Sequence, residues 1–233
     1  MHLLLRVLCM VLTGFFAGCT SPEQTQENNG IVTADSSHST AAVAQDNRKI
    51  ILFFGNSLTA GFGLEPEQAF PALIQLRIDS LGLPYRCINA GVSGETTASG
   101  NTRIDWMLEQ PVDILVIELG GNDGLRGISP EETRKNLQSI ISKAKTKYPA
   151  IKIVLAGMEV PPNMGQTYAA AFRKIYPELA QTNQLTLIPF LLDKVGGEPS
   201  LNLPDGIHPT AEGHRIVAET VWKYLQTLLT PAQ

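Results

Sequence analysis

The chain has 233 residues, 18 basic and 22 acidic, and a formal net charge of −4. Its basic residues do not cluster, so the composition argues against a nucleic-acid-binding protein. Residues 48–233 form a stretch of ordinary composition, long enough for one domain with a full apolar core.

The first 18 residues are typical of a secretory signal rather than of a fold. Arg6 precedes an apolar run over residues 7–16, which is too short to cross a bilayer as a helix. The run leads into Phe-Ala-Gly-Cys at residues 16–19, which resembles a bacterial lipobox. We therefore expect cleavage before Cys19, acylation of its thiol, and a lipid anchor in a bacterial cell-envelope membrane, on the periplasmic or surface side. The alternative is ordinary signal cleavage beside a chance cysteine.

Residues 19–47 are rich in Ser, Thr, Gln, Asn and Ala and nearly free of large apolar side chains. Such a segment cannot bury enough surface to offset its chain entropy, so we expect a flexible tether. Cys87 is then the one cysteine of the 48–233 domain, which excludes an intramolecular disulfide there. Its apolar surroundings predict a buried packing role. No CxxC motif or pair of histidines indicates a metal site, and we expect no cofactor.

Strands and helices alternate along the domain. Short apolar runs predict strands over residues 50–54, 85–88, 112–119, 151–156 and 185–189. Helical spacing predicts helices over residues 67–81, 129–148, 168–182 and 210–228. Pro66 marks the first turn of the first of these helices. Ser129 is an N-cap candidate, with Pro130 in the first turn and Glu132 at the capping-box position.

This alternation of nearly all-apolar strands with helices predicts an α/β fold, with a parallel sheet covered on both faces. We predict a three-layer α/β/α sandwich with a five-stranded sheet in the flavodoxin-like order 2-1-3-4-5. In such sheets ligands bind beyond the carboxyl ends of the strands, where the strand order reverses. Here that point lies between the first and third strands.

Glycine-rich polar turns follow the first three predicted strands, at residues 55–61, 89–97 and 120–124. Glycine lets the backbone turn sharply and approach a ligand closely. Three such turns on one edge of a sheet indicate a built site, whereas one alone would indicate only a loop.

Only two histidines, His208 and His214, fall in the predicted domain, so they are the only histidines there that could act as a general base. Asp205 precedes His208 by three residues, so its carboxylate can accept from Nδ1–H and leave Nε2 free to take a proton from a serine. Ser57, in the first turn, is the candidate serine. We expect Pro209 to end this loop and to start the last helix. The alternative role of Asp205 and His208 is to form a capping turn before that helix. We expect His214 to be solvated or to cap a helix.

Three motifs occur in the order typical of one hydrolase family. Gly-x-Ser-Leu lies at residues 55–58, Gly-Gly-Asn-Asp at 120–123 and Asp-x-x-His at 205–208. Together they resemble the SGNH (GDSL-type) hydrolase family. Residues 118–127 are similar to the bacterial thioesterase I, lysophospholipase L1 and arylesterase group, and so are residues 93–97 and 162–165. The resemblance extends from about residue 49 to 228.

The resemblance implies a serine hydrolase that cleaves acyl esters or thioesters, with arylesterase, acyl thioesterase or lysophospholipase action. It implies that Ser57 is the nucleophile, with His208 as base and Asp205 as the acid of the triad. It also implies an oxyanion hole formed by the backbone N–H groups of Ser57 and Gly94 and the side-chain amide of Asn122. An Asx turn that only shapes the loop is the alternative role for Asn122.

Other residues of these motifs have predicted structural roles. We expect Asp123 to brace a loop, and Thr96 and Thr97 to cap the following helix. Where the family has Gly-Asp-Ser, this chain has Gly-Asn-Ser, with Asn56 at the middle position. Asparagine has nearly the same shape and can brace the turn, but it removes a negative charge beside the nucleophile. We expect activity to survive; the rate and pH profile are left open.

Two other functions fit the same fold. A carbohydrate O-deacetylase would favour an aromatic-lined cleft, but the site loops hold few aromatic residues. A non-catalytic or flavin-binding lipoprotein would leave Asp205, His208 and Asn122 without a role.

Overall fold

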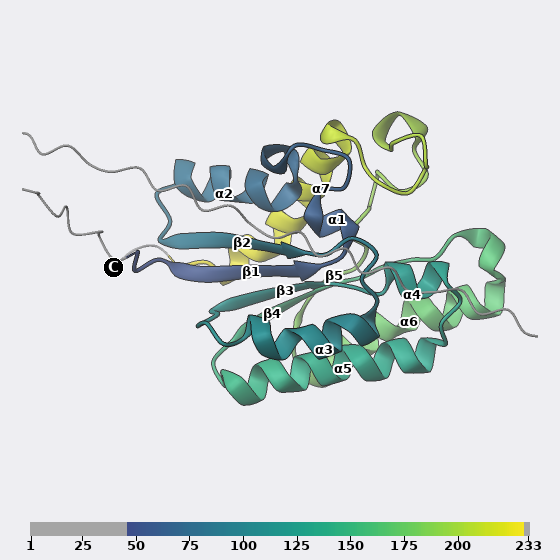
Figure 1. The fold of residues 1–233 in the computed structure, drawn as a ribbon, viewed down its shortest axis with the longest axis horizontal. Helices are drawn as coiled ribbons and strands as arrows, with labels where there is room; N and C mark the ends of the chain where they lie inside the picture. The colour runs from purple at the N-terminus through teal and green to yellow at the C-terminus, as the bar shows by residue number, and fades with distance from the viewer. Residues whose placement is uncertain (1–45, 231–233) are drawn as a thin grey trace, which may run out of the picture. The chain divides into compact units, whose positions relative to one another are not determined.

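A computed structural model describes residues 46–230, so the predicted signal, Cys19 and nearly all of the tether lie outside the described residues. The described part contains a five-stranded parallel sheet in the order β2-β1-β3-β4-β5, which confirms the predicted order (Figure 1). The strands are β1 (Lys49–Gly55), β2 (Tyr85–Gly91), β3 (Ile114–Glu118), β4 (Lys152–Ala156) and β5 (Thr186–Ile188).

Helices cover both faces of the sheet and give the predicted three layers. Figure 1 shows α2 (Phe70–Ser80) and α7 (Ala211–Leu225) on one face and α3 (Thr97–Met107), α5 (Pro130–Lys147) and α6 (Gln166–Asn183) on the other. The described part also contains two short helices, α1 (Ser57–Ala60) and α4 (Gly121–Leu125), and four 3-10 turns: η1 (Pro66–Gln68), η2 (Pro162–Met164), η3 (Pro199–Leu201) and η4 (Gln226–Leu228).

The central strands explain why the motifs meet at one edge. Residues 51–55 of β1 and all of β3 are buried, as strands covered by helices on both faces should be. In register, Gly55 at the end of β1 lies opposite Gly91 on one side and Glu118 on the other. The turns that follow these three strands therefore start side by side at the carboxyl edge of the sheet.

The helix predicted over residues 67–81 is wrong in one respect, because it is interrupted. The 3-10 turn η1 ends before Ala69, whose extended backbone (ψ 142°) separates it from α2. At the break, the Phe70 N–H donates to Nδ1 of His214 at 3.1 Å. His214 is only 1% exposed and stacks on the Phe70 ring, so the expectation of a solvated histidine was wrong, whereas its bond to the first N–H of α2 agrees with the capping alternative. Its position on the inward face of α7 is the physical reason.

The starts of two helices also differ from prediction. Thr210, not Pro209, caps α7 by accepting from the Gly213 N–H, and Pro209 instead forms an isolated bridge with Asn202. Thr96 caps α3 as expected, whereas Thr97 is the first residue inside that helix. Pro209 lies too early to start α7 because its segment is paired with an antiparallel neighbour.

Three further findings concern residues 46–230. None of their helices combines the length and apolar character that a membrane crossing requires. No group of three or more His, Cys, Asp or Glu side chains in this part is placed to hold a metal ion. Cys87 is partly buried against the core, and burial raises the pKa of its thiol to about 12, which suits packing rather than reactivity.

Candidate active site

Ser57 lies directly after the turn that joins β1 to α1, at the carboxyl edge of the sheet. It is the first residue of α1 and is 8% exposed. Asn56 caps this helix, since its Oδ1 accepts from the Leu58 N–H at 3.0 Å. Gly61 ends the helix in a left-handed conformation (φ 78°), which glycine adopts without strain. The hydroxyl of Ser57 is thus carried on a short turn that is tightly fixed at both ends.

His208 connects this hydroxyl to a carboxylate. Its Nε2 lies 2.9 Å from Ser57 Oγ, and its Nδ1 lies 2.7 Å from Asp205 Oδ2. The other oxygen of Asp205 accepts from the backbone N–H groups of Ile207 (2.9 Å) and His208 (3.1 Å). The Ile207 N–H and the His208 ring lower the pKa of Asp205 to about 2, so its carboxylate is anionic near neutral pH.

The loop that carries Asp205 and His208 is held at its base. The Leu203 N–H donates to the His208 carbonyl at 2.7 Å, and the Thr210 N–H donates to Leu201 O at 2.8 Å. The side chain of Asn202 is buried and donates to two backbone carbonyls, those of Val195 and Glu198. These bonds hold the imidazole in place although it comes from a loop.

An aromatic ring covers the imidazole. The Phe62 and His208 rings are 4.5 Å apart between centroids, with 35° between their planes. Phe62 remains 47% exposed and Ile207 43% exposed. Both apolar side chains therefore lie at the solvent-facing rim beside the serine–histidine pair. Phe62 was not singled out from the sequence, because an exposed aromatic residue in a turn carries no distinctive pattern.

The turns after β2 and β3 are joined to each other. Asn122, in the first turn of α4, donates through Nδ2 to Glu95 O at 3.0 Å, and Arg126 donates to Gly94 O at 3.1 Å. Gly94 has a left-handed backbone (φ 81°). The Asn122 amide carries two N–H bonds, and the contact to Glu95 uses one of them. The two predicted donors, Gly94 and Asn122, thus belong to adjacent turns on the same edge.

Asp123 braces these turns, as the sequence predicted. It is fully buried and accepts from the backbone N–H of Thr97 (2.9 Å) and from the Thr97 hydroxyl. The Thr133 hydroxyl on α5 also donates to it, at 3.4 Å. Asp123 therefore joins α4 to the start of α3 and the first turn of α5. It is directed into this cluster, which fits a structural role and not an acid–base one.

A second buried carboxylate lies beneath the Ser57 turn and was missed from the sequence. Glu118 ends β3 with 1% exposure, and all its hydrogen-bond donors belong to Asn56 and Thr59. Burial raises the pKa of this carboxyl to about 7, against the opposing effect of these donors. An acidic residue at the end of an otherwise apolar strand was the available signal. Asn56 braces the turn, as predicted, by donating to this group.

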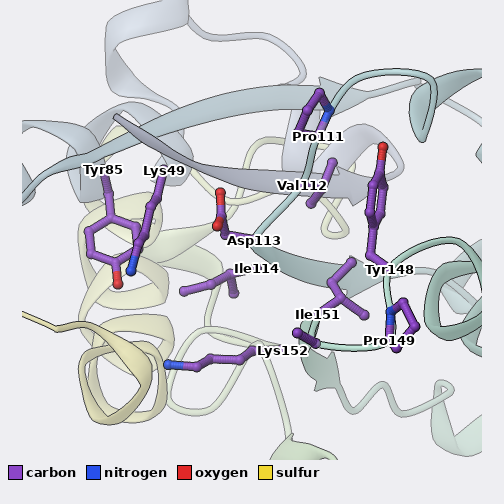
Figure 2. A pocket seen from close by; sticks show the side chains of 11 residues that line it. Lys49, Tyr85, Pro111, Val112, Asp113, Ile114, Tyr148, Pro149, Ile151 and Lys152 are labelled. Carbon is purple, nitrogen blue, oxygen red and sulfur yellow. The ribbon is translucent and has the colours of Figure 1, made fainter. Parts of the chain in front are cut away.

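A pocket of about 420 Å³ lies at the amino ends of β1, β3 and β4, the opposite edge of the sheet (Figure 2). Several of its polar groups make structural contacts: Asp113 accepts from the Ile50 N–H, and Lys152 donates to Leu228 O. The hydroxyl of Tyr148 lies within bonding distance of the carbonyls of Leu108 and Gln110. The serine, imidazole and carboxylate that are joined by hydrogen bonds lie at the other edge, so we place the chemistry at Ser57 and not in this pocket.

A serine hydroxyl, an imidazole and a carboxylate joined in this order, at the carboxyl edge of a doubly wound sheet, define a site of the serine-hydrolase class. Residues 53–216 match the model of the GDSL-like Lipase/Acylhydrolase family. The chain belongs to this family.

Similar proteins agree with this assignment. The chain is 40% identical to "Esterase TesA" of Pseudomonas aeruginosa over 180 residues. The aligned region covers 77% of this chain and 89% of the relative. It is 36% identical over 181 residues to "Thioesterase 1/protease 1/lysophospholipase L1" of Escherichia coli K12, covering 77% and 84%. A crystal structure of TesA superposes with a TM-score of 0.75 at 40% identity, covering 78% of this chain and all of that chain.

Proposed function

We propose that this protein hydrolyses carboxylic acyl esters and thioesters through an acyl-enzyme formed on Ser57. The observation that carries the proposal is the hydrogen-bonded series from Ser57 Oγ through the His208 ring to Asp205. A serine hydroxyl is a weak nucleophile at its own pKa and needs such a base. The relatives named as an esterase and as a thioesterase with lysophospholipase activity support the substrate class.

In the proposed reaction, Ser57 Oγ bonds to the substrate's carbonyl carbon while its proton passes to Nε2 of His208. The tetrahedral intermediate collapses when His208 returns this proton to the departing alcohol or thiol, and the acyl group stays on Ser57. Water then attacks the acyl carbon and gives a proton to the same nitrogen. The acid leaves as Ser57 regains its proton. Asp205 remains anionic and keeps Nδ1 protonated throughout.

The tetrahedral intermediate carries a negative charge on one oxygen. We assign its stabilisation to the backbone N–H groups of Ser57 and Gly94 and to the side-chain amide of Asn122. The short bridges between the turns after β2 and β3 support this assignment, because they hold two of the three donors in fixed positions. Preorganised donors of this kind each contribute about 3–4 kcal/mol to transition-state stabilisation.

The exposed side chains at this edge support an apolar acyl group rather than a sugar. Phe62 and Ile207 lie at the rim beside His208, and Val92 and Leu125, on the two neighbouring turns, are 45% and 42% exposed. A carbohydrate O-deacetylase is therefore not favoured. Burial of methylene groups against such a rim contributes about 0.8 kcal/mol for each group.

The test is hydrolysis of p-nitrophenyl esters from acetyl to palmitoyl, and of matched acyl thioesters, by the purified full chain. We expect turnover that rises from acetyl to longer acyl chains and disappears in Ser57→Ala. Release of acetate from acetylated sugars without turnover of the longer esters would instead assign the protein to the deacetylases.

We also propose that Cys19 carries a lipid anchor and holds the protein at a bacterial cell-envelope membrane. The lipobox-like residues 16–19 and the polar sequence that follows support this. Cys19→Ala should move the protein from the membrane to the soluble fraction, while the matched variant Cys87→Ala should stay with the membrane. Wild-type protein that already partitions into the aqueous phase in detergent phase separation would contradict the anchor.

A further inference from the structure

The side chain of Glu118 is a buried acid that the proposed reaction does not use. Its two oxygens have different roles. Oε2 accepts three hydrogen bonds, from the backbone N–H groups of Asn56 (3.1 Å) and Thr59 (3.3 Å) and from the Thr59 hydroxyl (2.8 Å). Oε1 accepts one, from Nδ2 of Asn56, at 2.8 Å. All four bonds come from the turn and helix that carry Ser57.

The carboxylate also packs directly against the backbone before the nucleophile. A Cβ atom added to Gly55 would lie 2.6 Å from Glu118 Oε2 and 2.1 Å from the Thr59 hydroxyl oxygen, distances that real Cβ atoms do not reach. Gly55 therefore has to be glycine because Glu118 and Thr59 fill the space beside it. The carboxylate and the turn form one packed unit.

The bond from Asn56 to Oε1 fixes which way the Asn56 amide points. The ionised carboxylate only accepts hydrogen bonds. In that state the NH₂ group must face Glu118 and the carbonyl Oδ1 must face the other way. There Oδ1 accepts from the Leu58 N–H at 3.0 Å and lies 3.4 Å from Ser57 Oγ. Reversing the amide would place NH₂ against the Leu58 N–H and remove the cap of α1.

We propose that Glu118 is a positioning residue for Ser57, acting through the orientation of the Asn56 amide. This inference rests on the proposed function. In this pair the ionised acid accepts from the amide NH₂, and the amide carbonyl is left to accept from the Leu58 N–H. An aspartate at position 56 would place two carboxylates face to face, and one of them would have to hold a proton. Asparagine at position 56 thus makes Glu118 the single acid beneath the nucleophile.

The decisive variants exchange the two groups. Glu118→Gln can keep a carbonyl oxygen at the Oε2 position, but it places an NH₂ group where Oε1 accepted from Asn56. The Asn56 amide must then reverse. We expect kcat to fall by about ten- to a hundredfold with KM changed less than about twofold, since substrate contacts are untouched. Adding Asn56→Asp restores one acid and one amide with all bonds available, and should recover kcat to within about threefold of wild type.

A stability control separates positioning from general damage. Ile140→Ala removes a buried side chain of α5, away from the Ser57 turn, and should lower Tm at least as much as Glu118→Gln does while keeping kcat near wild type. Should Glu118→Gln alone fail to fold, the folded double variant decides. A kcat of the double variant near that of wild type supports the positioning role of Glu118, and a kcat at least tenfold below wild type overturns it.

The outcomes also distinguish this inference from the proposed function. Turnover that persists in Ser57→Ala would overturn the function itself. An inactive Ser57→Ala beside a Glu118→Gln variant with wild-type kcat would leave the function standing and refute the role of Glu118. A Glu118→Gln loss that Asn56→Asp does not reverse would refute the orientation mechanism.

Discussion

Two histidines lie six residues apart, and the fold gives them opposite surroundings. His208 lies on a loop at the rim of the sheet, with its side chain 18% exposed and both ring nitrogens bonded to polar side chains. His214 lies between α2 and α7, where its Nδ1 accepts from the Phe70 N–H and its ring stacks on Phe70. The first can exchange a proton with a hydroxyl and with solvent. The second is neutral near neutral pH and joins α7 to α2 through its bond to the Phe70 N–H.

Replacing His208 should reduce activity strongly and stability little. His208→Ala removes the base that takes the Ser57 proton, so we expect kcat to fall by about ten-thousandfold or more. The variant should keep its far-ultraviolet circular dichroism spectrum and most of its Tm, because the ring packs mainly against the exposed Phe62. Steady-state hydrolysis of a p-nitrophenyl ester measures the loss. A decrease of less than tenfold would show that another group acts as the base.

Asp205→Ala should have a smaller effect than His208→Ala. The imidazole stays, but the carboxylate that fixes its tautomer is lost, and we expect kcat to fall by about a thousandfold. The same assay applies, with Asp193→Ala as a control acid in a neighbouring loop. Equal losses for Asp205→Ala and His208→Ala would mean that the carboxylate is needed for more than orientation.

Asn122→Ala tests a different kind of contribution from that of His208. The Asn122 amide stabilises charge but takes no part in proton transfer. Removing one oxyanion donor should lower kcat by about a hundredfold with KM nearly unchanged. Initial rates over a range of substrate concentrations separate the two constants. A large rise in KM at unchanged kcat would assign Asn122 to substrate binding instead.

His214 should give the smallest change in activity and a clear change in stability. His214→Ala leaves the Phe70 N–H without its acceptor and opens a cavity, so we expect a loss of about 2–4 kcal/mol in the free energy of unfolding. Turnover well below Tm should stay within about twofold of wild type. Chemical denaturation measures the first quantity, and a loss of activity in the folded variant would contradict the structural role.

The buried histidine should also make the free energy of unfolding depend on pH. Burial lowers the pKa of His214 from its ordinary 6.5 to about 4. Between these pH values the unfolded chain binds a proton that the folded chain does not. The free energy of unfolding should therefore decrease as pH falls from about 6.5 through 4, and the decrease should be weaker in His214→Ala.

The alternation of strands and helices was sufficient for the parallel sheet and for the polar groups at its carboxyl edge, whereas the strand order was predicted by analogy with flavodoxin-like folds. Apolar strands, glycine turns and short connections constrain an α/β fold strongly, so the edge where residues 55–58 and 120–123 meet follows from local patterns. The pairing of Ser57 with His208 spans 151 residues and was suggested by the motif order of the family resemblance. The bonds that join these side chains were predicted in type and are present in the structure.

What the sequence did not indicate depends on packing between distant segments. His214 is buried where α7 packs against α2, and its Nδ1 accepts from the Phe70 N–H directly after the break at Ala69. The carboxylate of Glu118 is buried under a turn that is 59 to 62 residues away in sequence. Helical periodicity and strand patterns describe one segment at a time, so they do not contain these contacts.

The most direct test of the account is the behaviour of Ser57→Ala toward an organofluorophosphonate and an acyl ester. This change deletes one hydroxyl and should leave the fold and Tm close to wild type. The wild-type protein should become covalently labelled and lose its activity, with the mass increase located on the peptide that contains Ser57. The variant should be neither labelled nor active. Labelling or ester hydrolysis that persists in the folded variant would contradict Ser57 as the nucleophile.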